Sequence, residues 1–149
     1  MTPEEPTVGE MNPQLAQIIE LAQSGKDEDW EKIDQIIPAI ANDKEFYSWA
    51  KENLGDGESN LRDLSATIIE SSQCSLTDED IKNLEQLMRE NDKNPYPSFR
   101  AACALARRIK DDPRISGLLP ALRNKLKLFL EDPNVSDIAR SYSSDLNRL

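Results

Sequence analysis

The sequence of 149 residues contains no histidine. Imidazole is the usual general base near neutral pH, and it completes the Ser-His-Asp and Cys-His systems and many zinc sites. Its absence excludes those catalytic and metal-binding arrangements. No other catalytic constellation is present in the sequence, so we expect a protein that is not an enzyme and that holds no cofactor and no metal.

Cysteine is also scarce, with only Cys74 and Cys103 in the chain. Two thiols are too few for a structural zinc site, and without a secretory signal they favour a reducing cytosol over a disulfide framework. Cys103 shares an apolar stripe with Phe99 and Ala106, which predicts a small core residue. Cys74 precedes a predicted helix start, where the helix dipole can stabilise a thiolate. The local sequence offers no Lys or Arg to activate it, which favours an incidental loop thiol.

Long apolar runs are missing as well. No stretch approaches the roughly 18 apolar residues that a membrane span needs. The first ten residues, MTPEEPTVGE, lack the basic and apolar regions of a signal peptide. We therefore expect a soluble, cytoplasmic protein without membrane association. The composition of residues 1–11 predicts a disordered acidic tail, followed by a single domain over residues 12–149.

The formal net charge is −10, and its distribution is uneven. Residues 1–60 hold 14 acidic and 4 basic side chains, whereas residues 61–149 hold 14 of each. The overall charge argues against non-specific binding to nucleic acid or anionic membrane. A basic cluster lies in residues 100–127 and supplies candidates for partner binding: Arg100, Arg107, Arg108, Lys110, Arg114, Arg123 and Lys127. The alternative interpretation is that these are solvated helix faces that balance the acidic half.

From residue 12 onward the apolar spacing is helical, with no convincing alternating pattern of a strand. The spacing predicts an all-α fold of helical hairpins over residues 12–41, 44–72, 77–110 and 113–147. Thr77 and Asp80 form a candidate capping box at the start of one helix. Pro38 and Pro120 lie inside helical patterns, where we expect kinks or breaks because proline removes a backbone donor.

The chain also contains an internal repeat. Residues 56–66, DGESNLRDLSA, align with residues 94–104, NPYPSFRAACA, at an offset of 38, and a degraded third copy covers residues 132–140. Each of the first two copies has a polar turn residue (Asp56 or Asn94), then an apolar residue, an arginine (Arg62 or Arg100) and small residues. In the third copy, Ser136 stands where the pattern expects arginine.

This pattern resembles a HEAT repeat, an armadillo-like α-hairpin, and is similar to the bacterial phycobilisome-lyase-like HEAT repeats. The resemblance implies a short right-handed α-α superhelix of about four hairpins. It also implies that Asp56 and Asn94 form the turns and that Arg62 and Arg100 contact an acidic turn of a neighbouring repeat. An ordinary non-repeating helical bundle remains the alternative fold.

Repeat solenoids bind partners on an extended face, which predicts a non-enzymatic protein–protein interaction module, as an adaptor, scaffold or inhibitor. We expect a monomer whose partner is another protein. An inhibitor of a basic target would use the acidic helices of residues 27–58. Two alternatives stay open: a chromophore-handling protein, on the resemblance to lyase-like repeats, and nucleic-acid binding through residues 100–127, which the net charge makes unlikely.

Overall fold

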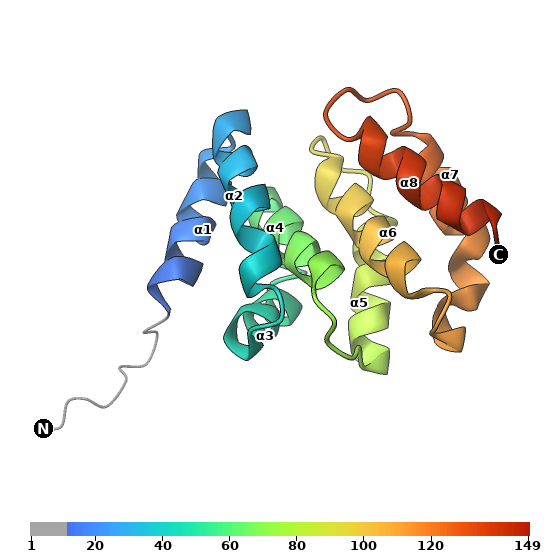
Figure 1. The fold of residues 1–149 in the computed structure, drawn as a ribbon, viewed down its shortest axis with the longest axis horizontal. Coiled ribbons are helices and arrows are strands. Elements are labelled where there is room, and N and C mark those ends of the chain that lie inside the picture. The colour runs from blue at the N-terminus through green and yellow to red at the C-terminus, as the bar shows by residue number, and fades with distance from the viewer. Residues whose placement is uncertain (1–11) are drawn as a thin grey trace, which may run out of the picture.

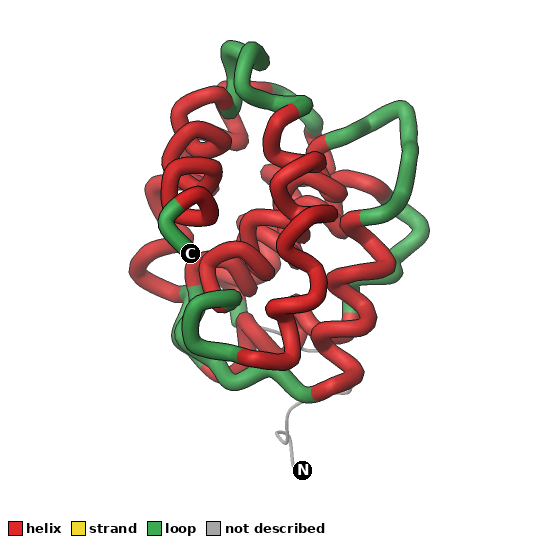
Figure 2. Tube along the Cα trace, turned by 90° about the vertical axis from the view of Figure 1, so that its right-hand side faces the viewer, coloured by secondary structure: helices red, strands yellow, loops and turns green. Residues whose placement is uncertain are grey.

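The computed structural model describes residues 12–149, and the predicted tail at 1–11 lies outside the described residues. Over residues 12–149 the chain forms eight α-helices and one 3-10 helix, with no strand (Figure 2). The all-α prediction is therefore confirmed. The elements are α1 (Pro13–Ser24), α2 (Asp27–Ile40), α3 (Lys44–Glu52), α4 (Ser59–Ser71), α5 (Asp78–Met88), α6 (Tyr96–Arg108), η1 (Pro113–Leu118), α7 (Leu119–Lys127) and α8 (Ser136–Asn147).

Local chemistry accounts for several helix ends. The side chain of Asn12 accepts hydrogen bonds from the first backbone N–H groups of α1, and Gly25 ends that helix with φ of 72°. Glycine adopts this left-handed conformation without steric cost, which allows the sharp turn into α2. At α5, the side chain of Thr77 accepts from the N–H of Asp80, whose carboxylate accepts from the N–H of Thr77. The predicted capping box is thus confirmed.

The two internal prolines behave differently. Near Pro120 the predicted long helix is divided, because the 3-10 helix η1 changes into α7 at Leu119. Pro120 then occupies the first turn of α7, where its missing N–H costs nothing. By contrast, α2 continues through Pro38 to Ile40 without a break. Pro38 is exposed and only two residues follow it in the helix, so few backbone hydrogen bonds depend on its position.

Successive helix pairs, from α1 and α2 to α7 and α8, follow one another along the long axis of the molecule in chain order (Figure 1). Each predicted hairpin range holds two successive α-helices, and α2, α4, α6 and α8 contact one another in that order. Helices α4 and α6 are central, since α4 packs against α1, α2, α3 and α6, while α6 packs against α4, α5, α7 and α8. Both central helices therefore bury side chains on almost every face.

Small residues let α6 pack closely on all sides. The helix buries Phe99 together with a run of small side chains from Ala101 to Ala106, of which Leu105 is the only large member. The Phe99 ring lies 4.6 Å, centroid to centroid, from the ring of Phe129. Cys103 is fully buried, as predicted for a core residue, and this burial raises the pKa of its thiol. No helix among the described residues has the length and apolar character to cross a membrane.

Candidate functional site

A groove of about 420 Å³ crosses the N-terminal halves of α2, α4 and α6 and reaches the loop before α8. It brings together residues from all four predicted hairpins. Its lining combines carboxylates, amides, two aromatic rings and one guanidinium: Gly25, Asp27, Trp30, Glu31, Asp34, Asn60, Asp63, Asn94, Tyr96, Arg100, Asn134 and Val135. The excess of carboxylates makes this groove electronegative.

Asp63 is the most buried carboxylate of the groove, with only 8% of its surface exposed. Among residues 12–149, its one hydrogen bond from a side chain comes from the Thr67 hydroxyl, at 3.3 Å to Oδ1. That hydroxyl also lies 2.8 Å from the Asp63 carbonyl oxygen, and its single proton favours the shorter contact. Burial raises the pKa of Asp63 to about 6, while the charge of Arg100 opposes the shift. Asp63 is therefore a buried carboxylate without a strong partner.

Glu70 is also buried and connects three helices. Its Oε1 accepts a hydrogen bond from Arg100 Nη1 at 3.1 Å, and the two side chains form an ion pair. Its Oε2 accepts a hydrogen bond from the Tyr142 hydroxyl at 2.8 Å. Arg107 donates to the Glu70 carbonyl oxygen. Burial and the nearby Glu70 carboxylate raise the pKa of Tyr142 far above its usual value. Helices α4, α6 and α8 are thus joined through one acidic residue.

The arginines predicted to bind a partner make contacts within the chain. Arg108 donates to the carbonyl oxygens of Ile69 and Ser72, each at 2.9 Å, and thereby satisfies carbonyls at the end of α4. Arg123 donates to the Leu146 carbonyl oxygen at 3.1 Å. Arg100 and Arg107 both contact Glu70, as described above. The predicted set is therefore divided between different parts of the fold.

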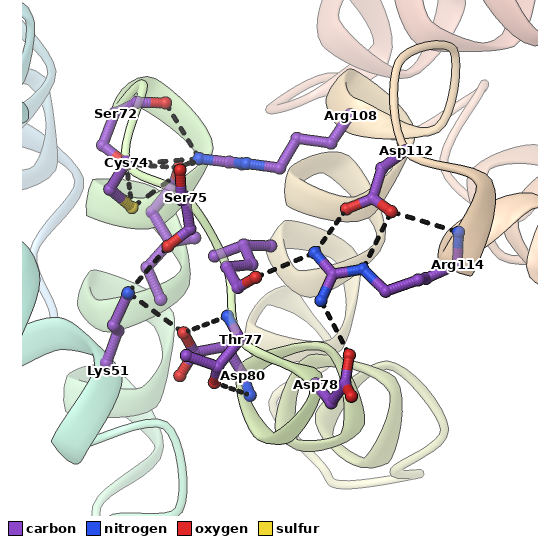
Figure 3. A network of polar contacts seen from close by, with 12 residues as sticks. Lys51, Ser72, Cys74, Ser75, Thr77, Asp78, Asp80, Arg108, Asp112 and Arg114 are labelled. Carbon is purple, nitrogen blue, oxygen red and sulfur yellow. Dashed lines mark hydrogen bonds and ion pairs between the residues drawn. The ribbon is translucent and has the colours of Figure 1, made fainter.

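Arg114 is held in the same way, beside the segment that joins α4 to α5 (Figure 3). Its guanidinium contacts the carboxylate of Asp78 at 2.7 Å and that of Asp112 at 2.8 Å, and it donates to the Leu76 carbonyl oxygen at 2.8 Å. Lys110 and Lys127 make no hydrogen bond or ion pair that involves their side chains in the described part of the chain. Partner binding by the predicted set stays a prediction.

Cys74 has a neighbour that its local sequence does not reveal. Arg108 Nη2 lies 3.9 Å from the Cys74 sulfur, and the Ser72 hydroxyl lies 2.9 Å from it (Figure 3). Cys74 and Arg108 are 34 residues apart, so only the packing of α6 against α4 brings them together. The thiol is half-buried at the edge of a second, smaller cavity of about 320 Å³.

The residues of the internal repeat lie at the junctions between hairpins. Arg62 donates to the Asp56 carbonyl oxygen at 2.7 Å within its own hairpin, and its Nη2 contacts Asp92 Oδ2 at 2.5 Å in the turn before α6. Asn94 Nδ2 donates to the Ser59 hydroxyl at 3.3 Å. The contact of Arg62 with an acidic turn of the next hairpin is the kind that the resemblance implies. Arg100 instead contacts a glutamate inside α4.

Arg62→Ala is expected to lower the free energy of unfolding by about 1 kcal/mol, because Asp56 and Asp92 lose their shared donor. The measurement is urea unfolding followed by circular dichroism. Arg148→Ala is the matched control, since Arg148 is exposed and, in the part of the chain that the structure describes, pairs only with Asp145 within its own helical turn. An equal effect of the two substitutions would contradict a role for Arg62 between hairpins.

The groove residues Trp30, Asp34 and Asp63, and the Glu70–Tyr142 contact beside them, were not among the residues predicted from the sequence. The sequence did contain one indication of these acidic residues: Asp63 and Glu70 flank the uncharged segment from Leu64 to Ile69. Their spacing of seven residues places them on one helix face.

Comparisons of this chain with protein-family models, with curated proteins and with solved structures found no match.

Proposed function

We propose that this protein is a non-enzymatic interaction module, a HEAT-like α-solenoid of four hairpins that binds a basic segment of another protein. The binding face in this proposal is formed by α2, α4, α6 and α8. The observation that carries it is the electronegative groove, whose lining comes from all four hairpins. A surface shared by successive repeats is the usual binding surface of solenoid proteins.

The spacing of the contacts between hairpins supports the solenoid. Arg62 contacts Asp92 and Arg100 contacts Glu70, each across 30 residues, and Arg114 contacts Asp78 across 36. These separations are close to one repeat length. In a repeat architecture each unit contacts mainly its neighbours, so side-chain contacts accumulate at this separation.

One longer contact supports the choice of face. Tyr142 in α8 donates to Glu70 in α4, across 72 residues and therefore across two hairpins. Helix α6 lies between these two helices in the packing order. Side chains of α8 and α4 can meet over α6 only if the three helices curve toward one another on that side. The face formed by α4, α6 and α8 is therefore proposed to be the concave one.

Charge complementarity supports a basic partner. Four carboxylates line the groove, at Asp27, Glu31, Asp34 and Asp63, against the single guanidinium of Arg100, which is already paired with Glu70. An electronegative cleft attracts positively charged segments and speeds their association. This proposal moves the binding surface from the basic residues 100–127 to the groove.

The test is capture of partners from the native cell lysate after nuclease treatment, with the groove variant Asp27→Asn/Glu31→Gln and the control variant Asp137→Asn/Asp145→Asn. Both variants change the net charge equally, and the control residues do not line the groove. We expect a protein partner that binds the control variant as it binds the wild type and that dissociates from the groove variant. Partners lost on nuclease treatment, or equal binding to both variants, would contradict the proposal.

A further inference from the structure

We propose that the floor of the groove is a subsite for one arginine side chain of the partner, held by Asp63 and Asp34 beside the ring of Trp30. This inference rests on the proposed function and deepens it by naming the side chain that is recognised. It follows from the buried carboxylate, the balance of charge around it and the aromatic residues of the lining.

Among the described residues, the buried carboxylate of Asp63 accepts one long hydrogen bond from a side chain. A buried carboxylate is costly unless it is paired and hydrogen-bonded, and that of Asp63 is more than nine-tenths buried with only the Thr67 hydroxyl at 3.3 Å. It lines the groove, so a ligand can reach it. A guanidinium that donates two N–H groups to this carboxylate would satisfy it in the bidentate geometry that arginine prefers.

The described residues that line the groove carry more negative than positive charge. Glu70 on α4 raises the pKa of both Asp34 on α2 and Asp63 on α4, and Arg100 on α6 lowers both. Arg100 is committed to Glu70 by its ion pair at 3.1 Å. Two carboxylates, Asp34 and Asp63, are left for an external cation.

The lining of the groove favours an arginine side chain over a metal ion. The described residues hold no group of three or more carboxylates or thiols that is arranged to bind a metal. Trp30 and Tyr96 line the same groove, and the planar guanidinium stacks on aromatic faces. The Tyr96 hydroxyl donates to Asp132 at 2.9 Å, which holds this ring in place. A groove of about 420 Å³ lies within the range of sites that enclose small organic ligands, about 300–1,000 Å³.

The experiment is titration of the ¹⁵N-labelled protein with N-acetyl-arginine amide at low ionic strength, followed by NMR. N-acetyl-citrulline amide is the matched probe, since it has nearly the same shape without the charge. We expect saturable shifts of the Trp30 indole and of the Asn60 and Asp63 amides with the arginine probe alone. Asp63→Asn should weaken binding about tenfold or more, because the bidentate acceptor is lost. The control Asp145→Asn should bind as the wild type does.

Equal shifts with citrulline, or unchanged affinity in the Asp63→Asn variant, would overturn the subsite. The outcome is independent of the capture experiment. A captured protein partner without arginine binding would refute the subsite and leave the proposed function. Arginine binding without any protein partner would establish the subsite and refute the interaction module.

Discussion

Replacing Arg100 with methionine is expected to lower the free energy of unfolding by about 3 to 5 kcal/mol, against a typical domain stability of about 5–15 kcal/mol. Arg100 and Glu70 are each only 12% exposed at their side chains. Without the guanidinium, Glu70 loses its ion-pair partner, and Asp63 and Asp34 lose the positive charge that lowers their pKa values. Removing one partner of a buried ion pair leaves an uncompensated charge, which is why the expected cost is large.

Urea unfolding at neutral pH measures this cost. The double variant Arg100→Met/Glu70→Met is the control, because removing both charges together avoids the unpaired carboxylate of Glu70 and should recover most of the stability. The proposed buried pair would be refuted by an Arg100→Met variant that loses no more stability than Arg62→Ala.

The second large effect concerns Asp63, whose replacement by asparagine is expected to stabilise the protein. In the folded state the pKa of Asp63 is raised from 3.8 to about 6, chiefly by burial. The folded protein thus binds this proton more strongly than the unfolded chain does. Its stability falls as the pH rises from about 4 through 6, and the full cost of the ionised carboxylate is present above pH 6. Asp63→Asn removes that cost, about 1–3 kcal/mol at pH 7.5.

The charged groups around Asp63 leave the net shift of its pKa upward. Asp34 from α2 and Glu70 from α4 raise the pKa of Asp63 further, whereas Arg100 from α6 lowers it without reversing the shift. The pKa of Asp34 is itself raised, mainly by burial, so it adds to the same trend.

Urea midpoints at pH 7.5, 6.0 and 4.5 test this prediction, with Asp145→Asn, an exposed carboxylate on α8, as the control. The gain from Asp63→Asn should be greatest at pH 7.5 and small at pH 4.5. A gain that does not change with pH would contradict the raised pKa of Asp63. A loss of stability at pH 7.5 would show that the ionised carboxylate is satisfied in the folded state. A stabilising substitution that also weakens arginine binding would show that Asp63 is retained at the expense of stability.

Local patterns predicted the helices well because their causes are local. Apolar side chains three and four residues apart define a buried face, and side chains such as Thr77 and Asp80 satisfy the free N–H groups of their own helix. The pairing of successive helices in the four predicted ranges depends mainly on short connections, which the sequence also displays. Pro38 is an exception, because the expected kink or break of the helix does not occur there. Its exposed position near the end of α2 depends on how that helix packs.

The basic residues show the limit of the same reasoning. Arg107 and Arg108 have the composition of an exposed cationic surface, yet they donate to carbonyl oxygens near the end of α4, 36 to 39 residues away. A charge pattern states which residues carry charge, but it does not state which partners the packing will place beside them.

By itself, the sequence determined the helical class, the capping box at α5 and the burial of Cys103. Only the tertiary structure decided that Asp63 lies buried in an electronegative groove, that Glu70 joins α4 to α6 and α8, and that Arg108 approaches Cys74. The physical reason is the distance along the chain over which each kind of interaction acts. Helix periodicity and capping act over one or two turns, whereas these polar contacts depend on the relative orientation of helices separated by 30 to 72 residues.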